Sequence, residues 1–172
     1  IDGEAAGDVS GDSISLSSDG LTLAVGASSN NGENGEYSGH VRVYQYDATS
    51  ETWGQLGSDI DGEAAGDYSG ISTSLSSDGL TLAVGALNND GENSADSGHV
   101  RVYQYDAIEG WVQLGKDIDG EAAGDLSGIS TSLSSDGLTL AVGALNNDGE
   151  NSADSGHVRV YQYDAIEGWV QL

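Results

Sequence analysis

Acidic side chains recur at regular spacing in one short segment, residues 59–67. Asp59, Asp61, Glu63 and Asp67 occupy its first, third, fifth and ninth positions, the spacing of oxygen ligands in many Ca²⁺-binding loops. Glycines occupy the fourth and eighth positions, whereas such loops usually place one at the sixth. The spacing predicts a calcium site, and the alternative is a solvated linker in which Asp and Gly serve as turn formers.

The same acidic pattern returns elsewhere in the chain. Later in the sequence it consists of Asp117, Asp119, Glu121 and Asp125. Near the N-terminus it is reduced to Asp2, Glu4 and Asp8. A second candidate calcium loop covers residues 88–96 and contains Asp90, Glu92 and Asp96. Calcium is therefore the cofactor that the sequence predicts, at the segments starting at Asp59 and Asp117.

Histidines and arginines also recur at matched positions. His40, His99 and His157 each precede an arginine by two residues. Imidazole is a common metal ligand, but one histidine per repeat converges only if the repeats face a narrow channel. A structural hydrogen-bonding role is therefore favoured for the histidines. In so acidic a chain, the arginines are expected to pair with neighbouring carboxylates; they are Arg42, Arg101 and Arg159.

Three near-identical repeats carry all of these residues. The sequence Ile-Asp-Gly-Glu-Ala-Ala-Gly-Asp begins at Ile1, Ile60 and Ile118. The predicted units are residues 1–59, 60–117 and 118–172. Over the stretch that both cover, the second and third differ only at Tyr68 against Leu126. Such identity indicates recent duplication or deliberate design, and the abrupt start at Ile1 indicates a processed product or an excised fragment.

Alternating apolar residues predict four strands within the second repeat. They cover residues 71–76, 80–86, 99–106 and 111–114. Asp78 and Gly79 favour a two-residue hairpin turn in which both have positive φ. No segment shows helical periodicity. Four antiparallel strands in each tandem repeat predict an all-β chain of three β-propeller blades, and a parallel β-solenoid is the alternative. Since three blades cannot close a ring, we expect oligomerisation or a longer parent chain to complete it.

Short motifs in each repeat resemble the FG-GAP repeat of integrin-α-type β-propellers. The pair Gly70-Ile71 stands where that family has Phe-Gly, and residues 84–86 match its Gly-Ala-Pro signature without the proline. Residues 98–103 match its Gly-x-Val-x-Val-Tyr strand. The resemblance implies an extracellular, ligand-binding or adhesive protein, commonly of seven blades. The calcium loop of that family is not matched, because residues 76–79 are too short to enclose an ion.

Composition excludes several classes of function. The chain has 172 residues, a net charge of −25 and only four Lys and Arg, which argues against nucleic acid and anionic membrane surfaces as partners. No apolar run is long enough to cross a membrane. Cysteine is absent, which excludes disulfides and thiolate sites. The acidic surface favours solubility, cation binding or a salty medium.

No catalytic motif stands out, and near-identical repeats lack the asymmetry of an active site. The sequence therefore predicts no enzyme but a non-enzymatic propeller module with a structural, adhesive or ligand-binding role, outside the cell or on its surface. Its expected partners are other blades, from the same chain or another copy, and a protein or glycan ligand. One alternative is an engineered or recently amplified symmetric scaffold that only self-assembles. A weaker alternative is a hydrolase or lyase built on a propeller.

Overall fold

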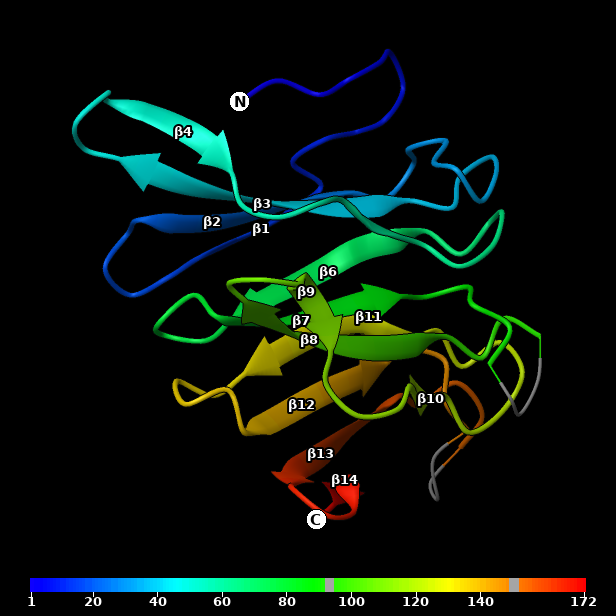
Figure 1. Cartoon of the computed structure of the whole chain (residues 1–172). Helices are drawn as coiled ribbons and strands as arrows, with labels where there is room; N and C mark the ends of the chain where they lie inside the picture. The colour runs from blue at the N-terminus through cyan, green and yellow to red at the C-terminus, as the bar shows by residue number, and fades with distance from the viewer. Residues whose placement is uncertain (92–94, 149–151) are drawn as a thin grey trace.

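The computed structural model describes residues 1–91, 95–148 and 152–172, and all regular structure in these ranges is β-strand. Three antiparallel sheets are stacked one after another along the chain (Figure 1). The first contains β1 (Ser13–Leu16), β2 (Thr22–Ala27), β3 (His40–Asp47) and β4 (Thr52–Gln55). The second contains β6 (Ser69–Leu75), β7 (Thr81–Ala86), β8 (His99–Asp106) and β9 (Gly110–Gln113). The third contains β11 (Ser127–Leu133), β12 (Thr139–Ala144), β13 (His157–Asp164) and β14 (Gly168–Gln171).

Each sheet is an up-and-down meander in which sequential strands pair. This arrangement confirms the prediction of four-stranded antiparallel blades. The described part of the chain has no helix, and hence no helix long and apolar enough to span a membrane. Two short strands lie outside the predicted set. β5 (Ile60–Asp61) pairs with the start of β3, and β10 (Ile118–Asp119) pairs with the start of β8. The outer edges of β3 and β8 are thus covered partly by the fourth strand of the blade and partly by the next linker.

The hairpin turn between the first two strands of a blade differs from the predicted two-residue turn. The Gly79 N–H donates to the Ser76 carbonyl at 3.0 Å, so the turn includes four residues. Only Gly79 has positive φ, at 72°, while Asp78 does not. The Asp78 carboxylate instead accepts from the Ser76 hydroxyl at 2.6 Å and from the Leu80 N–H at 3.0 Å. These hydrogen bonds hold the turn without positive φ at the aspartate.

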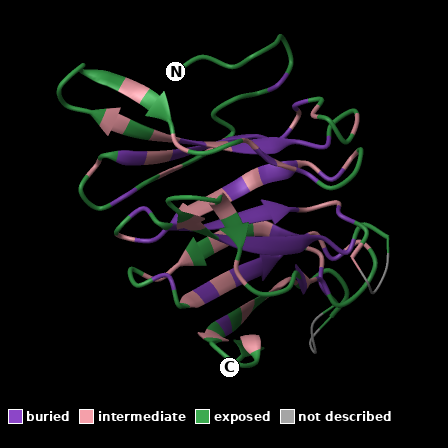
Figure 2. Cartoon of the chain, in the orientation of Figure 1, coloured by how far each residue is buried: buried purple, intermediate pink, exposed green. Residues whose placement is uncertain are grey.

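The hydrophobic core consists of two seams, one between each pair of neighbouring sheets. Leu82 and Val84 of β7 pack into the first seam, whereas Ala83 of the same strand packs into the second. Side chains of a strand alternate between its two faces, so β7 is buried at all six positions. Figure 2 shows this burial as the purple strands at the middle of the stack. The middle blade therefore has a neighbour on both faces.

The first and last sheets each leave one face uncovered by this chain. Val158 of β13 is 67% exposed, whereas the equivalent Val100 of β8 is fully buried. At the other end of the stack, Leu16 is 55% exposed, while its equivalent Leu75 is 7% exposed. The same residue types are thus core in the middle blade and surface at the ends of the stack.

Candidate functional site

Strand pairing at the outer edge of each blade brings a histidine and carboxylates together. His99 opens β8 and lies opposite Asp119 of β10, which places Asp117 beside the imidazole. The Nδ1 atom of His99 lies 3.9 Å from Asp117 Oδ2 and 3.9 Å from Glu63 Oε2. Glu63 comes from the linker between β5 and β6, so this cluster joins the inter-blade linker to the second blade.

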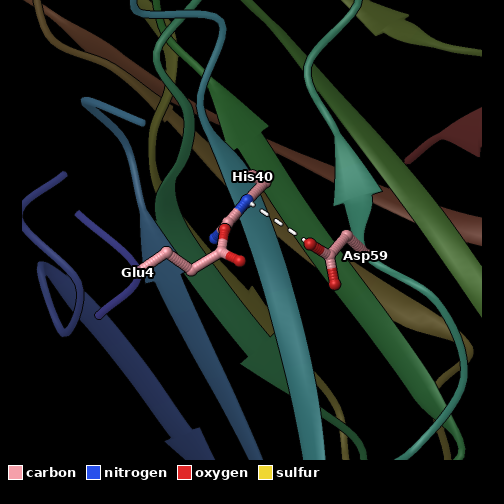
Figure 3. Close-up of side chains that lie close together, drawn as sticks. All are labelled: Glu4, His40 and Asp59. Carbon is pink, nitrogen blue, oxygen red and sulfur yellow. Dashed lines mark ion pairs between the residues drawn. The ribbon is translucent and has the colours of Figure 1, made fainter. Parts of the chain in front are cut away.

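The first blade has an equivalent cluster, formed by Glu4, His40 and Asp59. Figure 3 shows the carboxylates of Glu4 and Asp59 pointing toward the His40 ring, and His40 Nδ1 lies 3.8 Å from Asp59 Oδ2. In both clusters the ligand-type atoms lie within 4.8 Å of one another, so either group could hold a metal ion. In the third blade, His157 Nδ1 lies 3.7 Å from Glu121 Oε2.

An arginine side chain bridges the two carboxylates of the first cluster but not those of the second. The single Nε–H of Arg42 is shared between the two carboxylate oxygens of Asp59, at 3.0 and 3.1 Å, and the Nη2 atom contacts both Asp59 and Glu4. These hydrogen bonds, chiefly that to Asp59, raise the pKa of Arg42. Arg101 instead donates to the Asp61 backbone carbonyl at 2.7 Å. The predicted pairing of arginines with carboxylates is confirmed, but its geometry differs between blades.

The second arginine pairs more loosely than the first. Arg101 Nη1 lies 3.5 Å from Glu63 Oε1. Arg159 of the third blade repeats this arrangement, with its Nη1 3.8 Å from Glu121 Oε1. Asp117 accepts a hydrogen bond of 2.6 Å from the Gln113 side-chain amide on its other carboxylate oxygen. The oxygen of Asp117 that faces His99 is therefore left with the imidazole as its close neighbour.

His99 is the most buried member of these clusters, at 1% exposure. Neither of its ring nitrogens has a hydrogen-bond partner, so the predicted hydrogen-bonding role is wrong for this histidine. Burial, reinforced by the positive charge of Arg101, lowers the pKa of His99 to about 4. The imidazole is consequently neutral at neutral pH, and a neutral imidazole can act as a hydrogen-bond acceptor or metal ligand.

The acidic segment 59–67 does not fold into one ion-binding loop. Asp59 joins the first cluster, while Glu63 joins the second. Between them, Gly62 donates a backbone hydrogen bond of 2.8 Å to the Gly39 carbonyl. A Cβ atom at Gly62 would lie 1.9 Å from the Ser38 carbonyl oxygen, so only glycine allows this close approach. The segment crosses from one blade to the next here, which separates the two carboxylates.

The remaining predicted ligands have local roles or line pockets. Asp67 is buried and accepts hydrogen bonds from the Ala64 N–H and the Asn89 amide, both at 2.9 Å. Its equivalent Asp125 makes the same two contacts in the third blade. The half-buried Asp61 has its pKa raised by burial, with the charge of Asp59 adding to the effect. Asp119, the equivalent of Asp61, lies in β10.

In the second candidate loop, two carboxylate residues lie in the described part. The Asp96 N–H donates to the Asp90 carboxylate at 2.9 Å, and both residues line the larger pocket described below. Glu92 lies outside the described residues.

Sequence reasoning placed the metal ligands along a continuous loop and gave the histidines a structural role. The sequence signal that could have indicated the clusters was the histidine that recurs at the start of the third strand of each blade.

Two polar pockets open beside the clusters, one at each of the first two blades. The larger, of about 750 Å³, is lined by the inter-blade linker, the loop after β7, and Asp117 and Asp119. The smaller, of about 690 Å³, has an equivalent lining that includes His40, Asp59 and Asp61. Carboxylate and amide groups are present in both walls. The pockets can therefore form many hydrogen bonds to a hydroxyl-rich molecule or hold cations.

Comparison with solved structures identifies the architecture as three consecutive blades of a β-propeller. The periplasmic gluconolactonase PpgL of Pseudomonas aeruginosa matches over 92% of this chain and 44% of its own, with 21% identity and a TM-score of 0.56. A candidate 6-phosphogluconolactonase of Bacteroides uniformis matches over 92% and 39%, with 14% identity and a TM-score of 0.60. Sqt1 of Saccharomyces cerevisiae matches over 98% and 35%, with 14% identity and a TM-score of 0.51.

The chain thus spans less than half the length of each of these structures. No protein-family model matches the chain, and no curated protein matches it by sequence. The resemblance to FG-GAP repeats therefore stays a prediction.

The comparisons correct the predicted function. A non-enzymatic, adhesive or scaffold module was expected, yet two of the solved structures that share this fold are sugar lactonases or candidates for that activity. These neighbours contradict the prediction that the chain is no enzyme. One of them is periplasmic, which is compatible with a location outside the cytoplasm.

Proposed function

We propose that this chain forms three blades of a propeller enzyme that hydrolyses the ester bond of a sugar lactone. The observation that carries the proposal is the likeness of its fold to the two lactonase-type structures, each over 92% of the chain. Further blades, from a second copy or from a longer parent chain, complete the ring. We propose these further blades because the apolar residues at both ends of the stack are exposed, whereas their equivalents in the middle blade are buried in the core.

Charge favours an unphosphorylated lactone as the substrate. The net charge is −25, and the larger pocket is lined by six acidic residues: Glu63, Asp67, Asp90, Asp96, Asp117 and Asp119. A phosphate group entering such a pocket would be repelled. The hydroxyl groups of a neutral sugar lactone, in contrast, can donate hydrogen bonds to these carboxylates. We therefore propose a neutral sugar lactone as the glycan ligand, in place of an adhesion partner.

The reaction needs a group that accepts a proton from water. A water oxygen attacks the lactone carbonyl carbon, a carboxylate takes one proton, and the ring C–O bond breaks. The proton then passes to the departing alkoxide, which gives the open hydroxy acid. We assign the carboxylate role to Asp119 in the larger pocket and to its equivalent Asp61 in the smaller one, because both are half-buried in short strands that line the pockets.

We further propose that the protein works outside the cytoplasm, in the periplasm or beyond the cell. The periplasmic location of one structural neighbour supports this. Calcium is proposed as an ion for carboxylates of the two pockets, because oxygen-rich walls suit this hard cation. Titration with calcium chloride, with and without chelator, measures whether the folded chain binds it.

Hydrolysis of glucono-1,5-lactone is the direct test of the proposed activity. Proton release is followed in weakly buffered solution at constant pH, above the spontaneous rate, with the full chain at several concentrations. We expect activity with this lactone and little or none with its 6-phosphorylated form. The double variant Asp61→Asn, Asp119→Asn should lose most of the rate, since each side chain keeps its shape but cannot take a proton.

The matched control is Glu109→Gln, which removes one exposed carboxylate from the turn between β8 and β9. It should leave the rate unchanged. Equal rates for the double variant and the control would remove the assigned residues. A rate that never exceeds spontaneous hydrolysis, in a preparation of closed rings shown by its solution mass, would refute the lactonase proposal.

A further inference from the structure

We propose that Glu63, His99 and Asp117 form a site for one divalent transition-metal ion, such as zinc or manganese, that fastens the inter-blade linker to the second blade. The three residues come from three separate segments: the linker after β5, the start of β8 and the turn before β10. An ion held by all three would bridge these segments. This inference is independent of the proposed hydrolysis, because it concerns binding and stability alone.

The geometry suits a small ion with short bonds. One ligand-type atom from each residue lies within 4.8 Å of the others, and His99 Nδ1 is 3.9 Å from each carboxylate oxygen. Zinc binds nitrogen and oxygen at about 2.0–2.2 Å, which holds neighbouring ligand atoms roughly 3.0–3.5 Å apart. Small side-chain movements therefore suffice to reach bonding distance. The side chains of Glu63 and Asp117 are 44% and 35% exposed, so an ion can enter from the adjoining pocket.

An independent observation is the buried imidazole without a partner. His99 is 1% exposed, and no hydrogen bond satisfies either ring nitrogen. Leaving a buried polar group unpaired costs free energy, so such atoms in folded proteins usually have a partner. Nδ1 faces the two carboxylates, but at 3.9 Å from each it is too far to form a hydrogen bond with either. A bound cation would satisfy this nitrogen and neutralise the carboxylates that face it.

The donor set selects the class of metal. One imidazole nitrogen with two carboxylate oxygens suits zinc, manganese or iron, whereas calcium requires six to eight oxygen ligands in typical protein sites. The site therefore differs from the calcium loop that the acidic spacing alone predicts. No cysteine is present to shift the preference toward softer metals.

Among the described residues, only the second blade has a histidine facing two carboxylates that no arginine bridges, because Arg101 contacts Glu63 at 3.5 Å but forms no ion pair with Asp117. In the first blade, the Arg42 guanidinium already bridges Glu4 and Asp59 and supplies the positive charge. In the third, His157 faces Glu121 without a second carboxylate in the cluster. The expected stoichiometry is thus one tightly bound ion per chain.

Calorimetric titration of chelator-treated protein with zinc chloride tests this site. The solution contains high salt, which screens diffuse binding to the acidic surface. We expect one zinc ion per chain and a rise in melting temperature, because an ion bound only by the folded state stabilises it. Glu63→Gln and His99→Gln should each weaken zinc binding at least tenfold. The matched control Glu109→Gln, which also removes one carboxylate, should bind zinc as the unmodified chain does.

A positive test comes from Arg42→Ala. Removing the guanidinium opens the first cluster and should raise the stoichiometry from one ion to two. The proposal is overturned if zinc fails to bind, if Glu63→Gln and His99→Gln bind as tightly as the control, or if calcium binds this site more tightly than zinc. Lactonase measurements do not enter any of these outcomes, so this site and the proposed activity can fail separately.

Discussion

The indole N–H of Trp111 donates a hydrogen bond of 2.9 Å to the backbone carbonyl of Leu56, across the seam between the first and second blades. Trp169 repeats the contact with Leu114 across the second seam, also at 2.9 Å. Each tryptophan packs partly buried against the hydrophobic core of its seam. One side chain per seam thus combines apolar packing with a polar contact that fixes how the neighbouring blades meet.

Trp111→Phe should lower the free energy of unfolding by about 1 kcal/mol for the lost hydrogen bond, plus a smaller amount for reduced packing. The matched control, measured in single chains, is Trp53→Phe, because Trp53 has the equivalent position in the first blade, where no earlier blade of this chain lies against it. Urea unfolding of both variants measures the difference. If the two variants lose equal stability, the hydrogen bond across the seam contributes nothing measurable.

Gly85→Ala should destabilise the chain by several kcal/mol. A Cβ atom at this position would lie 2.0 Å from the Gly128 carbonyl oxygen of the next blade, so the seam must open to admit a methyl group. Gly143 is the equivalent residue of the third blade, where the closest atom is the Ser130 hydroxyl oxygen at 2.4 Å, a side-chain atom that can rotate away. In single chains, Gly143→Ala should therefore cost much less. Comparable melting temperatures for the two variants would contradict this account.

Stability should fall as the pH is lowered from about 6.5 to about 4, because of His99. Its pKa is about 4 in the folded chain and near 6.5 when unfolded, so the unfolded chain binds more protons between these values. The charged groups around the ring are Arg101, which lowers this pKa, and Asp117 and Asp67, which raise it, with Glu63 also facing it. The stability that comes from keeping His99 neutral is fully present above pH 6.5. About 3 kcal/mol of the free energy of unfolding is lost below pH 4.

Urea unfolding at several pH values, with chelator present, measures this dependence. The variant His99→Gln should lose less stability over the same interval than the unmodified chain. The carboxylates away from the ring are the same in both proteins, so the difference between the two curves reports on the imidazole and the groups that face it. Parallel curves would show that the protonation of His99 is not coupled to folding.

Val158→Glu should prevent association between chains. Val158 is 67% exposed on the free face of the third blade, while the equivalent Val100 is fully buried against the next blade. If a second copy covers this face, a charge placed there would be buried without a partner, which is strongly unfavourable. Sedimentation should give multiples of the 17.5 kDa chain mass for the unmodified protein and single chains for the variant. Single, stable chains of the unmodified protein would contradict self-association.

Local sequence patterns were sufficient for the four main strands of each blade. Alternating apolar residues marked residues 99–106, which match β8 without error, and the repeat made the three blades recognisable. β5 and β10 were missed because two-residue strands carry no periodicity and depend on a distant partner. The two-residue turn was also wrong, since the Asp78 carboxylate replaces positive φ with side-chain hydrogen bonds.

The candidate site was predicted less well than the fold. Sequence reasoning named Asp59, Glu63 and Asp117, which the structure places in two clusters, but grouped them by their distance along the chain. It set His99 aside because one histidine per repeat converges with the others only if the repeats face a narrow channel. The structure confirms that the histidines do not converge, yet each of the first two has its own pair of carboxylates from separate segments.

The sequence by itself determined the strand pattern, the three blades and the acidic character, because these follow from neighbouring residues and from repetition. Only the tertiary structure decided that Asp59 and Glu63, four residues apart, belong to different clusters. The physical reason is that Ile60 is buried in the first seam and β5 pairs with β3, after which Gly62 passes close to the Ser38 backbone into the second blade. A contact across blades depends on packing, which spacing along the chain does not encode.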